Sequence, residues 1–192
     1  VPILPLPLIP ERKKMIELVT RKTETDLQRK ISAVDLFCGA GGLTHGLEKS
    51  GIAVNLGIDI DPACEYPYSS NNKANFLLKS VENVAGSELL DAYNGADFRL
   101  LAGCAPCQTF SSYNQKADSS DKRWWLLLQF LRLIRETEPE LVTMENVPGL
   151  RDRDVFKEFV ADLGEREYHV NYQVVNCAKY GLPQHRNRLV LL

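Results

Sequence analysis

Short apolar segments alternate with amphipathic segments along most of this 192-residue chain. Each apolar segment has the length of a strand, and most are followed by a turn rich in Gly, Pro, Asp or Asn and then by a segment with helical spacing. This alternation is typical of an α/β fold, in which helices cover both faces of a doubly wound, mainly parallel sheet. The expected strands are Ile31–Phe37, Ala53–Ile58, Phe76–Lys79, Phe98–Ala102, Leu141–Met144, Tyr168–Val175 and Arg188–Leu192.

Helical spacing is clearest in the segment Arg123–Glu138, where large apolar residues recur on one face and Pro139 ends the pattern. The other expected helices are Leu43–Ser50, Ala63–Asn71, Ala85–Ala92 and a stripe from Val155 to Leu163 that Gly164 ends. We expect residues 31–192 to form one catalytic domain. Residues 1–30 form an N-terminal extension, which is rich in proline at first and then permits a helix.

Composition narrows the classes of protein. With 44% hydrophobic and 25% charged residues, the chain has the make-up of a globular domain in water, and no apolar run approaches the ~20 residues of a membrane span. The net charge of −2 predicts no strong unaided affinity for nucleic acid. The five cysteines show no disulfide framework, which favours a reducing cytoplasm.

A glycine-rich loop, Asp35-Leu36-Phe37-Cys38-Gly39-Ala40-Gly41-Gly42, joins the first strand to the first helix. Glycines there let a ligand approach the backbone closely, and Asp59 at the end of the second strand could accept both hydroxyls of a ribose. The third glycine of a dinucleotide fingerprint is replaced by Thr44 and no Walker lysine is present, while the acid Asp35 suits a cationic amine such as that of S-adenosylmethionine. The alternative is a turn that only packs the helix on the strand.

A second loop, Gly103-Cys104-Ala105-Pro106-Cys107, follows the fourth strand. Loops beyond the carboxyl ends of strands carry the chemistry of open α/β sheets, so we interpret Cys107 as a nucleophile. Cys107 could instead be a small buried hydrophobe, or Cys104 and Cys107 could form a redox pair or half a zinc site. The sequence has no second CxxC and its three histidines are scattered, which argues against a metal.

Two polar segments lie where the same edge of the sheet is expected. Glu145-Asn146-Val147 follows the strand Leu141–Met144, and Gln184-His185-Arg186-Asn187-Arg188 leads into the last strand. In an extended chain Gln184, Arg186 and Arg188 would share one face, and two arginines there could hold a phosphate or a base carbonyl. A helix cap or turn at Glu145 and a solvated edge at the arginines are the alternatives.

The motifs DLFCGAGG, GCAPCQTFS, ENV and QHRNR, in this order from Ile31 to Leu192, resemble the cytosine-5 DNA methyltransferase family. The resemblance implies a Rossmann-like fold that binds S-adenosyl-L-methionine and acts on double-stranded DNA, with no metal and no membrane. The implied catalytic residues are Cys107, Glu145, Arg186 and Arg188. The implied cofactor-binding residues are Phe37, Gly39, Ala40, Gly41, Gly42, Asp59, Ile60, Ser80 and Leu126, and the implied substrate-binding residues are Pro106, Gln108, Ser111, Asn146 and Gln184.

The reaction implied by the resemblance is chemically coherent. A thiolate that adds to carbon 6 of cytosine makes carbon 5 nucleophilic toward the sulfonium methyl, and a carboxyl at ring nitrogen 3 offsets charge as the adduct forms. Loss of the proton at carbon 5 then expels the cysteine. Because stacking hides the ring, the base must first be flipped out of the duplex.

The sequence also departs from the family pattern. Ser80 stands where an acid usually binds the adenine amino group, and neither the target-recognition domain nor the two last motifs is found in residues 1–192. We therefore expect a fragment or a split-enzyme subunit that is inactive or weakly active alone and needs a second polypeptide carrying the recognition domain. A bacterial restriction-modification enzyme in the cytoplasm is favoured over a nuclear, eukaryotic one. The alternatives are a tRNA cytosine-5 methyltransferase, a non-catalytic module that binds a cofactor or partner, and a nicotinamide-dependent oxidoreductase.

Overall fold

A computed structural model describes residues 29–106 and 124–192 of the chain. The strands are β1 (Ile31–Leu36), β2 (Ala53–Asp59), β3 (Asn75–Leu78), β4 (Phe98–Gly103), β5 (Leu141–Asn146), β6 (Tyr172–Asn176) and β7 (Asn187–Leu191). The α-helices are α2 (Gly42–Lys49), α3 (Glu65–Asn71), α4 (Gly86–Ala92), α5 (Trp125–Thr137) and α6 (Asp154–Glu165). Short 3-10 turns lie at Pro62–Cys64, Val81–Asn83, Pro148–Leu150 and Cys177–Tyr180.

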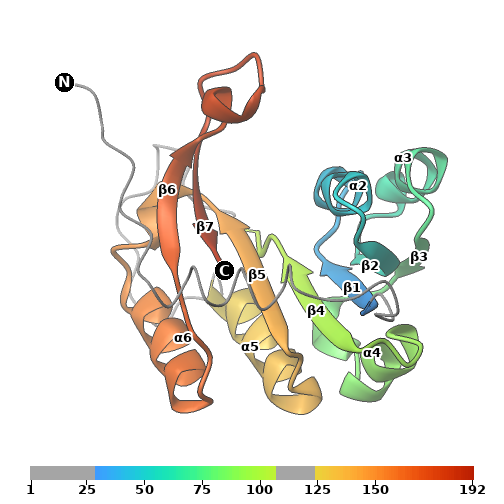
Figure 1. The fold of residues 1–192 in the computed structure, drawn as a ribbon, viewed down its shortest axis with the longest axis horizontal. Helices are drawn as coiled ribbons and strands as arrows, with labels where there is room; N and C mark the ends of the chain where they lie inside the picture. The colour runs from blue at the N-terminus through green and yellow to red at the C-terminus, as the bar shows by residue number, and fades with distance from the viewer. Residues whose placement is uncertain (1–28, 107–123) are drawn as a thin grey trace, which may run out of the picture.

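The strands form one seven-stranded sheet in the order β3-β2-β1-β4-β5-β7-β6 (Figure 1). The first five strands pair in parallel, whereas β7 runs antiparallel to both β5 and β6. The chain moves from β1 toward β3 on one side and from β4 toward β6 on the other. The strand order therefore reverses between β1 and β4, which is where open α/β sheets bind their ligands. The predicted doubly wound, mainly parallel sheet is confirmed.

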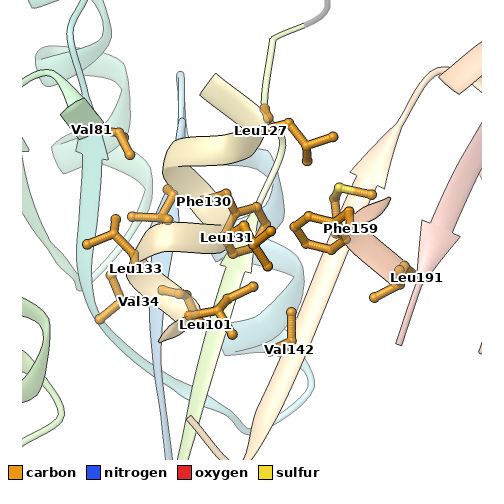
Figure 2. Packing of buried hydrophobic residues seen from close by; sticks show 14 of the residues in the cluster. Val34, Val81, Leu101, Leu127, Phe130, Leu131, Leu133, Val142, Phe159 and Leu191 are labelled. Carbon is orange, nitrogen blue, oxygen red and sulfur yellow. The ribbon is translucent and has the colours of Figure 1, made fainter. Parts of the chain in front are cut away.

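Neighbouring residues of each central strand face opposite sides of the sheet and reach two separate clusters. Val34 and Leu101 join the cluster that includes Phe130 of α5 and Phe159 of α6, while Ala33 and Leu100 join the smaller cluster around Tyr68 of α3. Figure 2 shows Phe130 beside Phe159, and their ring centroids are 5.8 Å apart. The larger cluster fixes α4, α5 and α6 on one face of the sheet.

Several of the predicted boundaries differ by one or two residues, and three of them are wrong for reasons that the structure shows. Strand β5 continues through Glu145 and Asn146, because antiparallel pairing with β7 keeps these polar residues in the ladder. Helix α6 passes through Gly164 to Glu165, and the left-handed Glu167 follows it. The backbone N–H of Tyr168 donates to the carbonyl of Leu163 at this helix end, so β6 begins only at Tyr172.

None of the helices within the described ranges is long and apolar enough to cross a membrane. Of the predicted N-terminal extension, only Arg29 and Lys30 are among the described residues, and the backbone N–H of Lys30 donates to the Asp97 carboxylate (2.7 Å).

Candidate active site

Sheet register brings the two predicted loops and Glu145 to one edge. Leu36 at the end of β1 lies opposite Gly103 of β4, and Gly103 lies opposite Met144 of β5. The backbone N–H of Cys104 donates to the carbonyl of Leu36 (3.2 Å), so the start of the cysteine loop is held beside the start of the glycine loop. Residues far apart in the sequence thus meet at the carboxyl ends of the central strands.

The glycine loop turns tightly and leaves open space at two of its glycines. Gly41 has a φ of 88°, and a Cβ there would lie 2.1 Å from Nδ2 of Asn72. A Cβ on Gly39 or Gly42 would meet nothing within 4 Å. Packing therefore explains Gly41, as the simple turn interpretation requires. Gly39, with a φ of 53°, also suits the turn, whereas neither packing nor φ explains Gly42; the backbone at both residues is open to a ligand.

Asp59 ties the end of β2 to the glycine loop. Its Oδ2 accepts the backbone N–H of Gly39 (2.8 Å) and its Oδ1 accepts the backbone N–H of Asp61 (3.0 Å). Each carboxylate oxygen has a second lone pair for a ligand hydroxyl. The neighbouring Ile60 is 69% exposed, so its side chain is accessible to the flat face of an adenine.

Asp35 does not face the open side of this loop. The side chain is fully buried, and its Oδ2 accepts a hydrogen bond from the Thr44 hydroxyl (2.7 Å), which lies 3.1 Å from the Tyr68 hydroxyl. Burial raises the pKa of Asp35 to about 7, although the Thr44 hydrogen bonds oppose the shift. The expected contact between Asp35 and a cofactor amine is thus not supported, because the carboxyl is enclosed by protein.

Glu145 is held at both of its carboxylate oxygens. Nε of Arg188 lies 2.5 Å from Oε1, and the Cys104 thiol donates to Oε2 at 2.5 Å. Burial raises the pKa of the Cys104 thiol, and the hydrogen bond to Glu145 and its negative charge raise it further. Cys104 therefore stays protonated at neutral pH and is poorly suited to be the nucleophile.

Asn146 anchors the cysteine loop from the neighbouring strand. Its buried side-chain amide donates to the carbonyl of Ala105 (3.0 Å), and its Oδ1 accepts the backbone N–H of Val147 (2.8 Å). Pro106, which follows, is half-buried. Cys107, Gln108 and Ser111 lie outside the described residues, so their roles stay predictions.

The remaining predicted site residues have fewer contacts that tie them to the site. Ser80 follows β3 and precedes a 3-10 turn, Phe37 and Leu126 are half-buried, and Ala40 is exposed. Gln184 lies in a bend and Arg186 precedes β7, so Gln184 does not share the extended face that the sequence predicted for the two arginines. The contact that the prediction missed is Cys104 with Glu145; its signal is the position of Cys104 directly after a strand end.

The chain was compared with known proteins. Residues 31–192 match the family model described as C-5 cytosine-specific DNA methylase. The Type II methylase M.HgiDII of Herpetosiphon aurantiacus is 49% identical over 163 residues, which are 83% of this chain and 46% of that protein. M.AquIA, a Type II methyltransferase of Picosynechococcus, is 30% identical over 173 residues, 83% of this chain and 70% of that protein. This chain thus spans about half the length of M.HgiDII.

Solved structures support the same fold. The Dnmt2 methyltransferase of S. pombe superposes with a TM-score of 0.67 at 19% identity, covering 84% of this chain and 48% of that one. The Entamoeba histolytica methyltransferase EhMeth gives a TM-score of 0.68 at 23% identity, covering 85% and 52%. The fold is that of S-adenosylmethionine-dependent methyltransferases. With this fold, the four motifs and a family match that extends from β1 to the end of the chain, the protein belongs to the C-5 cytosine-specific DNA methylase family.

Proposed function

We propose that this chain is the catalytic part of a DNA cytosine-5 methyltransferase, and its Type II relatives support a role in a restriction-modification system. The observation that carries the proposal is the meeting of Glu145 and Arg188 with the start of the cysteine loop, next to the glycine loop. A carboxylate beside a cysteine loop and an open cofactor loop is what methylation at carbon 5 of a flipped cytosine requires.

The protein groups have separate tasks in this proposal. Cys107 adds to carbon 6 of the cytosine, forming a carbon–sulfur bond that is broken again when carbon 5 loses its proton. Glu145 contacts the ring at nitrogen 3 and offsets the charge that develops during addition. Arg188 holds the Glu145 carboxylate in place, and Asn146 holds the backbone of the cysteine loop through Ala105.

The described residues fit S-adenosylmethionine as the cofactor. The backbone from Gly39 to Gly42 would lie against the cofactor. Asp59 would accept hydrogen bonds from the ribose hydroxyls, and the exposed Ile60 would contact the adenine. When bound, this cofactor supplies an electrophilic methyl group. Ser80, in place of the usual acid, offers a hydroxyl rather than a carboxylate near the adenine.

We also propose that a further polypeptide segment covers one face of the sheet, contributed by a second chain that carries a target-recognition domain. An apolar groove of about 430 Å³ lies on the α2 side. Relatives such as M.HgiDII are about twice as long as the matched region, and the additional half could supply such a segment. The residues that line the groove include Leu43, Leu47, Leu100, Leu141, Val170 and Leu191.

Covalent trapping tests the proposed chemistry. The chain, with and without an added recognition polypeptide, is mixed with S-adenosylmethionine and DNA containing 5-fluorocytosine, which blocks release of the cysteine. We expect a stable adduct with DNA that is lost in Cys107→Ser and largely kept in Cys104→Ser. Capture of an equivalent fluorocytosine-containing tRNA in place of DNA would favour the RNA alternative, and binding of cofactor without any adduct would favour a non-catalytic module.

A further inference from the structure

The Cys104 thiol occupies an unusual position for a residue outside the expected chemistry. It is half-buried, is not in a disulfide, and donates a hydrogen bond to Oε2 of Glu145 at 2.5 Å. The same carboxylate contacts Nε of Arg188 through Oε1. The two oxygens of Glu145 therefore have two different donors, one charged and one neutral.

The backbone around this thiol is fixed from both neighbouring strands. The N–H of Cys104 donates to Leu36 of β1, and the carbonyl of Ala105 accepts from the Asn146 amide of β5. Because Glu145 also belongs to β5, directly after the residue paired with Gly103, donor and acceptor are held by the sheet itself. Strand register thus places the two backbones side by side, and the Glu145 side chain reaches the thiol from there.

We infer that Cys104 is a positioning residue that orients the Glu145 carboxylate for the target base. The carboxylate has about four lone-pair sites, so the thiol can hold Oε2 before a base arrives and keep this contact while the base binds. Arg188, the charged partner, keeps its contact throughout. This inference rests on the proposed function for the identity of the base, but the thiol–carboxylate contact itself can be tested without any substrate.

Alkylation tests the contact in the chain alone. In a Cys107→Ser background, the rate at which iodoacetamide modifies Cys104 is followed by mass spectrometry of its peptide. We expect Glu145→Gln to increase this rate roughly tenfold, because loss of the negative charge makes the thiolate easier to form beside Arg188. Glu140→Gln is the matched control, since Glu140 pairs with Arg99 and lines the groove instead. An unchanged rate in Glu145→Gln overturns the inference, whatever the enzyme does.

Kinetics of the complete enzyme test the positioning role. Cys104→Ala removes the donor and should lower kcat roughly tenfold, the effect of a lost hydrogen bond to a charged group, with little change in KM for DNA. Cys104→Ser keeps a donor and should restore kcat to within about twofold. Equal losses in both variants would show that a hydrogen-bond donor at position 104 does not sustain kcat, and would overturn the positioning role while leaving the proposed reaction intact.

Discussion

Asp59 is the side chain that joins the glycine loop to β2, and it is also the proposed ribose ligand. Asp59→Ala should weaken S-adenosylmethionine binding by about 1–3 kcal/mol, because it removes hydrogen bonds to a charged acceptor and releases the N–H of Gly39. Isothermal titration calorimetry measures the change. Asp61→Ala is the control, since the exposed Asp61 caps only the turn that follows. Equal affinity in Asp59→Ala and the unmodified chain would remove Asp59 from the site.

Asp35 should make the stability of the chain depend on pH. Its pKa of about 7 in the folded chain exceeds the ordinary value of 3.8. As pH rises, the carboxyl group therefore loses its proton at a lower pH in the unfolded chain than in the folded chain. The contribution to stability is therefore fully present below pH ~4 and is lost as pH rises through ~7. Between about pH 5.5 and about pH 8 this group alone should lower the free energy of unfolding by roughly 2 kcal/mol.

Urea unfolding at those two pH values tests the role of Asp35. Asp35→Asn keeps an acceptor for the Thr44 hydroxyl but cannot ionise, so it should reduce the difference between the two pH values by most of that amount. Asp91→Asn, an exposed position on α4, should leave the difference unchanged. The buried-carboxyl explanation fails if Asp35→Asn retains the full pH dependence.

The glycine loop and α2 depend on Gly41 more than on Gly39. Both have positive φ, so an alanine at either position should cost about 1–2 kcal/mol of backbone strain. At Gly41 the new Cβ also meets the Asn72 amide and the Tyr68 ring, which adds roughly 1–3 kcal/mol of overpacking. Denaturant unfolding of Gly41→Ala and Gly39→Ala measures the difference. An equal loss of unfolding free energy in the two variants would show that Asn72 and Tyr68 move aside for the new Cβ without an energetic penalty.

The central strands were predictable, because a short and mainly apolar segment indicates a strand without knowledge of the strands that pair with it. Ile31–Phe37 and Phe98–Ala102 each fall within one residue of β1 and β4. The end of β5 was not predictable, since Glu145 and Asn146 look like loop residues until β7 pairs with them. The antiparallel direction of β7 depends on the connection from β6, and the local spacing of apolar residues does not indicate the direction of a strand.

The same distinction holds for the site. The glycine loop, Asp59 and Glu145 carry motifs, so the sequence alone indicated them. The contact between Cys104 and Glu145 joins residues 41 positions apart, and only the register of β4 against β5 brings them together. The burial of Asp35 could not be predicted from the sequence either. An acid near the end of a strand suggests a ligand-binding residue, and only the structure shows that Thr44 and Tyr68 lie around its carboxyl group.

The assembled sheet has an edge that carries the proposed catalytic residues, here called the catalytic edge, and an apolar groove on the α2 side. The described residues form a single α/β unit, and within them we find no separate domain that could enter a DNA groove beside the catalytic edge. Sequence is read from base edges, and nonspecific affinity comes mainly from basic charge, of which a chain with a net charge of −2 has little in excess. Flipping a base costs a few kcal/mol, which contacts on both sides of the duplex normally offset.

Residues 1–192 alone should therefore not methylate DNA at a defined sequence. Tritiated methyl transfer to DNA is measured with the purified chain, and again after adding a polypeptide that corresponds to the additional half of M.HgiDII. We expect specific methylation only in the mixture. Leu47→Glu and Leu141→Glu, which place charge in the apolar groove, should weaken the restored activity, whereas Leu90→Glu on the exposed side of α4 should not. Specific methylation by the chain alone would show that residues 1–192 already contain the reading element, and the groove would then need another explanation.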